Sequence, residues 1–241
     1  FREADWMNEL SLTAKGYLGS EEDAERIASA ERASVLIISD THGHYGVFEA
    51  IVREFGPQSD VLLFAGDGMW DVAEYVENAL ENERLRDALP PLVCFVAGNG
   101  DGDSYRVGLP SGFPESSPEE APGRTIPVPS RQVVRVAGSS ILLVHGHRHS
   151  VDVSPEILVD SARALDCDVA VFGHTHVPFF EEYGKIAALN PGSAARPRGG
   201  SSAGFAVLQI DRAELAPRAD FYIANQGLMG RYWFDSVYRQ P

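Results

Sequence analysis

The sequence predicts an α/β fold whose first half contains a largely parallel sheet. Three short apolar runs, at residues 34–39, 60–66 and 91–98, have the continuous hydrophobicity of strands covered on both faces. Two segments with helical spacing, 45–56 and 69–89, lie between them. Strand, helix, strand, helix, strand is the order of a parallel sheet with crossover helices.

The elements that follow favour antiparallel pairing. Residues 131–146 predict a hairpin with a Gly-Ser-Ser turn. Residues 154–166 predict a helix with Ser154 as N-cap and Pro155 at the first helical position. A buried strand is expected within 167–176. Antiparallel strands should complete the fold, and they are expected at 179–190, 204–211 and 219–224.

Three regions are expected along the chain. Residues 1–32 predict a helical extension in which Ser20 caps the helix that starts at residue 21. Residues 33–212 form the main domain, with an insertion at 100–130 that is rich in Gly, Pro and Ser and is either a mobile lid or a passive loop. Residues 213–241 add a strand and an aromatic tail that docks on the domain or on a second copy of the chain.

Composition limits the classes of partner. The 241 residues carry a net charge of −15, which disfavours a long nucleic acid. No apolar run is long enough for a membrane span and no leader is visible, so we expect a cytoplasmic protein without a membrane partner. The two cysteines, Cys94 and Cys167, are expected to be buried reduced thiols, too few for a disulfide framework.

Polar, metal-binding residue types follow five of the apolar strands. Because ligands bind beyond the carboxyl ends of strands in open α/β sheets, these strand ends predict one shared site. Two metal ions need about seven ligands, and a carboxylate can bridge them. The candidate ligands are Asp40, His42, Asp67, Asn99, His145, His174 and His176.

The residue types also indicate the chemistry. Imidazole and carboxylate without thiolate suit two divalent ions, with manganese expected first and nickel, iron or zinc as alternatives. Two carboxylates and two divalent ions leave a charge of about +2, which attracts a phosphate ester to an otherwise acidic protein. Such ions lower the pKa of a bridging water, so that hydroxide attacks phosphorus in line.

The ordered motifs DTH, GD, GN, HGH and GHTH resemble those of the calcineurin-like metallophosphoesterase superfamily. Residues 190–198, NPGSAARPR, are similar to a turn in its small, cap-less bacterial and archaeal phosphodiesterases. The resemblance implies a four-layer α/β/β/α sandwich of two mixed sheets flanked by helices. It also implies one ion held by Asp40, His42, Asp67 and His176, and a second held by Asp67, Asn99, His145 and His174.

One position departs from the family pattern. Gly100 follows Asn99 where the family usually has His or Cys, and in relatives with His that imidazole assists the leaving group. The departure disfavours phosphomonoesterase and protein phosphatase activity. His44, His147 and Asp101 are the candidate proton donors. Arg198 is a candidate phosphate ligand.

The leading hypothesis is therefore a metal-dependent phosphodiesterase that hydrolyses a small phosphodiester, with metal-bound hydroxide as nucleophile. A phosphomonoesterase or a nuclease using the same site is an alternative, although a nuclease would normally need a basic track. A third possibility is a protein-interaction scaffold that kept the fold and lost the chemistry. All seven ligand positions are filled, which argues against that scaffold.

Overall fold

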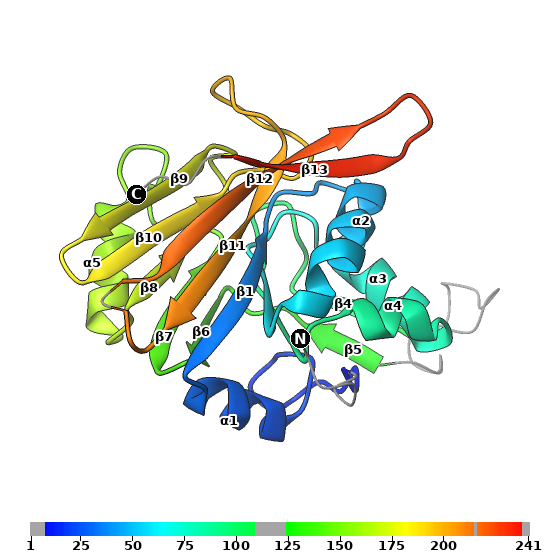
Figure 1. Cartoon of the computed structure of the whole chain (residues 1–241), viewed down its shortest axis with the longest axis horizontal. Helices are drawn as coiled ribbons and strands as arrows, with labels where there is room; N and C mark the ends of the chain where they lie inside the picture. Colours follow the sequence, from blue (N-terminus) through cyan, green and yellow to red (C-terminus); the bar gives the residue numbers. More distant parts are fainter. Residues whose placement is uncertain (1–7, 109–123, 215, 238–241) are drawn as a thin grey trace.

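The computed structural model describes residues 8–108, 124–214 and 216–237. Its largest sheet has six strands in the order β13-β12-β11-β1-β2-β3 (Figure 1). Strands β1, β2 and β3 are parallel, as predicted, and β11 joins β1 antiparallel. The bounds are β1 (Arg32–Ile38), β2 (Val61–Phe64), β3 (Leu92–Phe95), β11 (Gly204–Asp211), β12 (Arg218–Gln226) and β13 (Tyr232–Val237).

A second sheet has five strands in the order β6-β7-β8-β10-β9. Strands β7, β8 and β10 are parallel, whereas β6 and β9 pair antiparallel at its edges. The bounds are β6 (Arg131–Val136), β7 (Ser139–Val144), β8 (Val169–Val171), β9 (Pro178–Tyr183) and β10 (Ile186–Pro191). The predicted hairpin is present, but its turn is Ala137–Gly138, because both residues have positive φ while Ser139 and Ser140 belong to β7.

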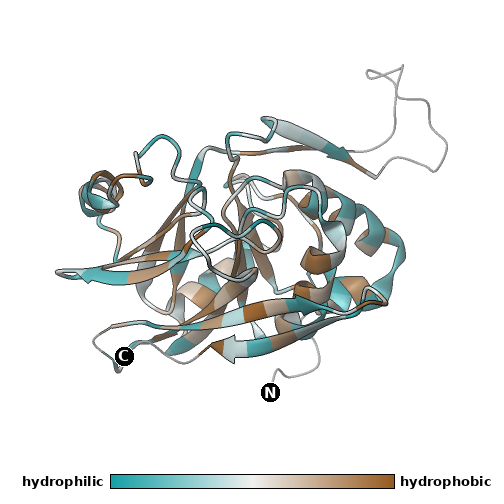
Figure 2. Cartoon of the chain, turned by 90° about the horizontal axis from the view of Figure 1, so that it is seen from above, coloured by the Kyte–Doolittle hydropathy of each residue, from teal (hydrophilic) through white to brown (hydrophobic). Residues whose placement is uncertain are grey.

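The two sheets pack face to face through an apolar layer that includes Val35 and Ile37 of β1 and Ile141 and Leu143 of β7. The outer face of the six-stranded sheet packs on α2 (Tyr45–Phe55), α3 (Met69–Glu81) and α4 (Glu83–Ala88), with the short 3₁₀ helix η1 (Gly56–Gln58) following α2. The outer face of the other sheet packs on α5 (Glu156–Ala164). Figure 2 shows the apolar residues gathered on the strands and on the inward faces of the helices. The α/β class with mixed sheets and flanking helices is confirmed.

The N-terminal extension is only partly helical. Helix α1 covers Glu21–Ser29, and the predicted Ser20 cap accepts a hydrogen bond from the Asp23 amide at 3.0 Å. Residues 8–19 are not helical, because Leu18 exchanges backbone hydrogen bonds with Val93 of β3 and so continues the sheet edge. Residues 1–7 of the predicted helical extension lie outside the described residues.

The segment at 100–130 contains regular structure that its composition did not predict. Strands β4 (Ser104–Val107) and β5 (Arg124–Pro127) form a two-stranded antiparallel sheet. Its inward side chains, Tyr105, Val107 and Ile126, are buried in the main core, and this burial stabilises strands of only four residues. Residues 109–123, the middle of the expected lid or loop, lie outside the described part of the chain.

The described part of the aromatic C-terminal segment lies against the domain, which is one of the two expected positions. It forms β13, and Phe234 lies edge-on to Phe55 of α2 and to Phe205 of β11, with ring centroids 5.5 and 5.4 Å apart. Tyr232 lies against Gly46. Docking on a second copy stays a prediction, and residues 215 and 238–241 are outside the described residues.

Three smaller features concern the remaining predictions. Helix α5 starts one residue later than expected, because Pro155 is its N-cap and the Ser154 hydroxyl accepts from the Glu156 amide. Cys94 and Cys167 are buried free thiols, as predicted. Within the residues described, no helix has the length and apolar character needed to cross a membrane.

Candidate metal centre

The predicted ligands lie where the strand ends of both sheets meet, on backbone with an unusual conformation. Five of the seven have positive φ values between 48° and 69°. This left-handed region is costly for residues with a β-carbon, and such strain concentrates at functional sites. The five are Asp40, His42, Asp67, His174 and His176.

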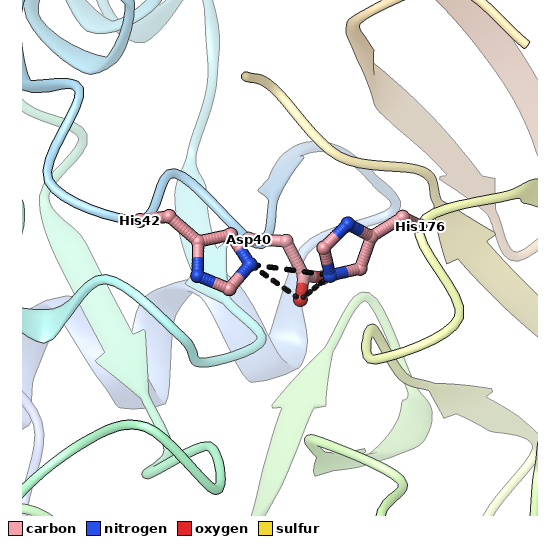
Figure 3. Close-up of side chains that lie close together, drawn as sticks. All are labelled: Asp40, His42 and His176. Carbon is pink, nitrogen blue, oxygen red and sulfur yellow. Dashed lines mark hydrogen bonds and ion pairs between the residues drawn. The ribbon is translucent and has the colours of Figure 1, made fainter. Parts of the chain in front are cut away.

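The first group of side chains consists of Asp40, His42 and His176 (Figure 3). The Nε2 atoms of the two histidines are 3.1 Å apart, and they lie 3.8 Å (His42) and 3.1 Å (His176) from Oδ1 of Asp40. Asp40 is fully buried and His176 is 3% exposed. Two ring nitrogens and one carboxylate oxygen therefore face a common point, as ligands of one cation do.

The second group consists of Asp40, Asp67 and His145. His145 Nδ1 is 2.7 Å from the Ala65 carbonyl, and its Nε2 lies 3.5 Å from Oδ2 of Asp67. The other oxygen of Asp67 accepts from the Gly100 amide at 2.7 Å. In this geometry Asp40 is common to both groups, whereas the family resemblance implied Asp67 as the bridging carboxylate.

Two buried atoms of these groups have no hydrogen-bond partner within the described chain: Asp40 Oδ1 and His145 Nε2. Leaving such atoms unsatisfied costs about 1–3 kcal/mol each unless something else binds them. Both are typical metal ligands, so the residues fit divalent ions, as the sequence predicted.

Electrostatics of the metal-free centre couple these side chains. Burial alone would raise the pKa of Asp67, but the His145 imidazole, the Gly100 amide and His42 together outweigh it and hold that pKa well below its usual range. Burial would lower the pKa of His145 and of His176, yet the carboxylates of Asp67 and Asp40, respectively, raise both. For His42 burial prevails and lowers the pKa.

Glycine is required at two positions around the carboxylates. A β-carbon at Gly98 would lie 2.0 Å from Oδ1 of Asp67. A β-carbon at Gly173 would lie 2.0 Å from the Ser39 hydroxyl oxygen and 2.6 Å from Oδ2 of Asp40. The glycines predicted from the GN and GHTH motifs therefore allow the strand ends to approach the ligands closely.

The remaining two predicted ligands lie at the edge of the centre. Asn99 is exposed, between two glycines that both lie against Asp67. His174 is partly buried, its ring centroid is 5.2 Å from that of His145, and its Nε2 is 3.0 Å from Oδ2 of Asp152. Neither belongs to the two compact groups, so their roles as ligands stay predictions.

The three candidate proton donors differ in their surroundings. His44 is exposed at the N-cap of α2, with Nδ1 2.9 Å from the Thr41 carbonyl. The ring centroid of His147 is 5.4 Å from that of His145, which places His147 at the centre. The carboxylate of Asp101 accepts from the backbone amides of the loop that carries Asp67, so proton donation by Asp101 stays a prediction without support from its contacts. Those amides belong to Asp67, Gly68 and Met69, and the Asp101 carboxylate also accepts from the amide of Gly98 in its own loop.

Three residues that sequence reasoning missed also hold the centre together. The Ser193 hydroxyl donates to the Asp40 carbonyl at 2.7 Å, and the NPGS motif was the signal that could have identified it. Asp71, 1% exposed, accepts from the Gly43 amide beside His42. Asp152 gave no signal, because it lies in an irregular turn between β7 and α5.

Two groups of candidate metal ligands at the junction of two mixed sheets are the arrangement of a metallophosphoesterase-like protein. Residues 34–213 match the family model of the calcineurin-like phosphoesterase superfamily domain. The chain therefore belongs to this superfamily, as its motifs indicated.

Similar proteins carry related names. A probable metallophosphoesterase of Mycoplasma pneumoniae is 29% identical over 68% of this chain and 80% of its own length. Phosphodiesterase YfcE of Escherichia coli K12 is 27% identical over 73% of this chain and 88% of its own.

Solved structures with this fold include proteins with and without a phosphoesterase name. A predicted phosphoesterase of Streptococcus pneumoniae has a TM-score of 0.58 and 20% identity, over 88% of this chain and all of its own. Vacuolar protein sorting 29 of Cryptosporidium parvum has a TM-score of 0.57 and 22% identity over the same shares. At these identities the likeness shows the fold alone.

Proposed function

We propose that the protein is a metal-dependent phosphodiesterase that hydrolyses a small phosphodiester with two divalent ions, manganese being the first to test. The observation that carries the proposal is the pair of ligand groups sharing Asp40, whose Oδ1 is buried without a hydrogen bond. A phosphodiesterase name among the relatives supports the choice of a diester.

The side chains would have separate roles in this reaction. Asp40, His42 and His176 would hold one ion, and Asp67 and His145, with Asn99 and His174, the other, while Asp40 would also contribute to the second ion. When bound, the ions would supply an acidified water and positive charge for the phosphoryl oxygens. Ser193 and Asp101 would keep the two carboxylate-bearing loops in place through their contacts with backbone groups. His147 is the proposed proton donor that lies at the centre.

The loop after β10 favours an anionic substrate. The Arg196 carbonyl accepts from Nδ1 of His176 at 2.5 Å, and the Arg198 amide donates to the His176 carbonyl. Burial is the main reason why the pKa of His42 is lowered, and the Arg196 guanidinium acts in the same direction. Burial and the Arg198 guanidinium oppose the rise in the pKa of His176. Both guanidinium groups are exposed on the loop that contacts His176, and we propose that they attract the phosphate.

An exposed aromatic side chain in the first turn of α3, shortly after Asp67, favours an ester with a planar organic group. Trp70 follows Asp67 by three residues, in the first turn of α3, and is 71% exposed. One contact of its ring is with Tyr105, at 5.1 Å between centroids, and the Tyr105 hydroxyl lies 3.4 Å from Asp101. We propose that Trp70 stacks on the base or aryl group of the diester.

The first experiment is hydrolysis of bis(p-nitrophenyl) phosphate and p-nitrophenyl phosphate by the metal-stripped protein, before and after addition of Mn²⁺. The Asp67→Asn variant is the matched control. We expect cleavage of the diester that depends on Mn²⁺ and is lost in the variant. Preferred cleavage of the monoester would favour a phosphomonoesterase. Metal binding without turnover of either ester would favour the interaction scaffold.

A further inference from the structure

The imidazole of His174 is held by a carboxylate from another loop. Its Nε2 is 3.0 Å from Oδ2 of Asp152, which lies in the turn between β7 and α5. The side chain of His174 is 22% exposed and that of Asp152 is 58% exposed. The pair therefore sits at the solvent-facing rim of the metal centre.

The other histidines with a fixed ring are held through the opposite nitrogen. His145 and His176 each use Nδ1, paired with the backbone carbonyls of Ala65 and Arg196. Each carbonyl can only accept, so the proton is on Nδ1 and Nε2 keeps its lone pair for the centre. In His174 the acceptor lies at Nε2, so the proton is on Nε2 and the lone pair on Nδ1.

Both ends of His174 are fixed by acidic residues. Its backbone amide donates to Oδ2 of Asp40 at 3.1 Å, while Asp152 binds the ring. The ring is T-shaped to that of His145, with centroids 5.2 Å apart. The His174 ring therefore lies next to the His145 ring, at the edge of the Asp67–His145 group.

The turn that carries Asp152 is anchored in the core. Val151 is 7% exposed and lies so close to Gly146 that a β-carbon there would be 2.8 Å from the valine. The Val153 and Ser154 amides donate to the Ser150 carbonyl at 2.9 and 3.3 Å. The carboxylate is thus placed by packing and by turn hydrogen bonds on both sides of it.

We infer that Asp152 is a positioning residue that fixes the tautomer and orientation of His174, so that Nδ1 donates to the second ion and Asp152 sets the affinity for that ion. The inference rests on the proposed dinuclear site. It predicts unequal ion sites: the ligands of the first ion are aligned by buried hydroxyls and a backbone carbonyl, whereas a ligand of the second depends on an exposed side-chain carboxylate. Partners of this kind commonly change metal affinity by about 10- to 100-fold.

If Asp152 and His174 formed only an ordinary exposed ion pair, removing it would leave metal affinity almost unchanged. A positioning role and an ordinary ion pair can therefore be distinguished by metal affinity. The test is calorimetric titration of the metal-stripped full chain with Mn²⁺, comparing wild type, Asp152→Asn and Asp160→Asn. Asp160 is an exposed carboxylate of α5 that pairs with Arg163, and it serves as the matched control.

We expect two binding events in the wild type and in Asp160→Asn. In Asp152→Asn the weaker event should lose about 10- to 100-fold in affinity while the tighter event is unchanged. Equal affinities in all three proteins would overturn the inference. Equal weakening of both events would also overturn it, because that result indicates a general structural effect.

A second measurement does not depend on metal. The ¹⁵N chemical shifts of the His174 ring in the metal-free protein report its tautomer, and we expect the proton on Nε2 in the wild type and a mixture in Asp152→Asn. A wild type that shows this tautomer but binds fewer than two ions would overturn the dinuclear site and the affinity role, while leaving the orientation of His174 correct. A proton on Nδ1 in the wild type would overturn the positioning role itself.

Discussion

The two halves of the candidate metal centre differ in the groups that hold their ligands in place. Around Asp40, His42 and His176, support comes from the buried hydroxyls of Ser193 and Ser39 and from the backbone carbonyl of Arg196. Around Asp67 and His145 the inner support is similar, but the outer ligand Asn99 is exposed, and His174 is held by the exposed carboxylate of Asp152. Asp40 belongs to both halves.

The difference indicates where the fold alone determines metal binding and where surface residues adjust it. A ligand aligned by a backbone carbonyl keeps its partner when a single side chain is replaced. A ligand aligned by an exposed carboxylate can be altered by one substitution that costs little stability. We therefore expect the first ion site to be intrinsic to the fold and the second to be the adjustable one.

The largest effect is expected from a change of Asp40, because both halves of the metal centre then lose a ligand. In Asp40→Asn we expect metal content to fall and kcat for a diester to fall by about three orders of magnitude, since bound metals supply several kcal/mol of transition-state stabilisation. Elemental analysis and steady-state kinetics measure both. Asp160→Asn should behave as wild type, and full metal content in Asp40→Asn would contradict the shared role.

A second test shows whether Asp101 holds the loop that carries Asp67 in place or acts as a proton donor. In Asp101→Asn the charged acceptor for the loop amides is lost, and we expect the free energy of unfolding of the metal-free protein to fall by about 2–3 kcal/mol. Urea denaturation measures the change. If Asp101 is instead a proton donor, stability would be retained and one limb of the pH–rate profile would disappear.

Much of this centre could be predicted from the sequence, for a physical reason. Asp40, Asp67 and His145 each follow a continuous apolar strand. Parallel pairing of β1 and β2 brings Asp40 and Asp67 to one edge, and the packing of the two sheets adds His145 from the end of β7. The small residues next to them, such as Gly98 and Gly173, marked the close approaches that the structure contains.

The supporting contacts could not be predicted, because they depend on how irregular turns fold back. Asp152 has no periodicity and no motif around it, although it reaches His174. Asp101 was interpreted as an acid, since sequence alone cannot show that backbone amides occupy its oxygens. Strands β4 and β5 were missed because four-residue strands among Gly and Pro resemble a loop until their burial is known.

Acidification should weaken metal binding at both halves. Neighbouring carboxylates raise the pKa of His145 and His176 above the ordinary value of about 6.5. A metal must displace these protons, so affinity is highest above the raised pKa values and falls as pH decreases through them. We expect Mn²⁺ affinity to be about tenfold or more lower at pH 6 than at pH 8, measured by calorimetry. Equal affinities at the two pH values would show that these imidazoles are not ligands.

The smallest expected effect is on the KM for esters with a planar group, which Trp70 is proposed to contact close to the second ion site. If Trp70 stacks on a planar ester group, Trp70→Ala should raise KM for the p-nitrophenyl ester of a nucleoside monophosphate by about 5-fold, the lower end of a single stacking contact. Methyl p-nitrophenyl phosphate, which has no base, should be less affected, and kcat should change little because Trp70 contacts no metal ligand in the proposed scheme.

Two variants control for loss of an exposed aromatic side chain in general. Trp233→Ala removes a 48% exposed tryptophan from β13 and should leave both KM values unchanged. Trp70→Phe should retain most of the preference for the nucleoside ester, because a phenyl ring can still stack. A parallel rise in KM for both esters in Trp70→Ala would mean that Trp70 supports α3 rather than the substrate, and the planar ester group would then have to be recognised elsewhere.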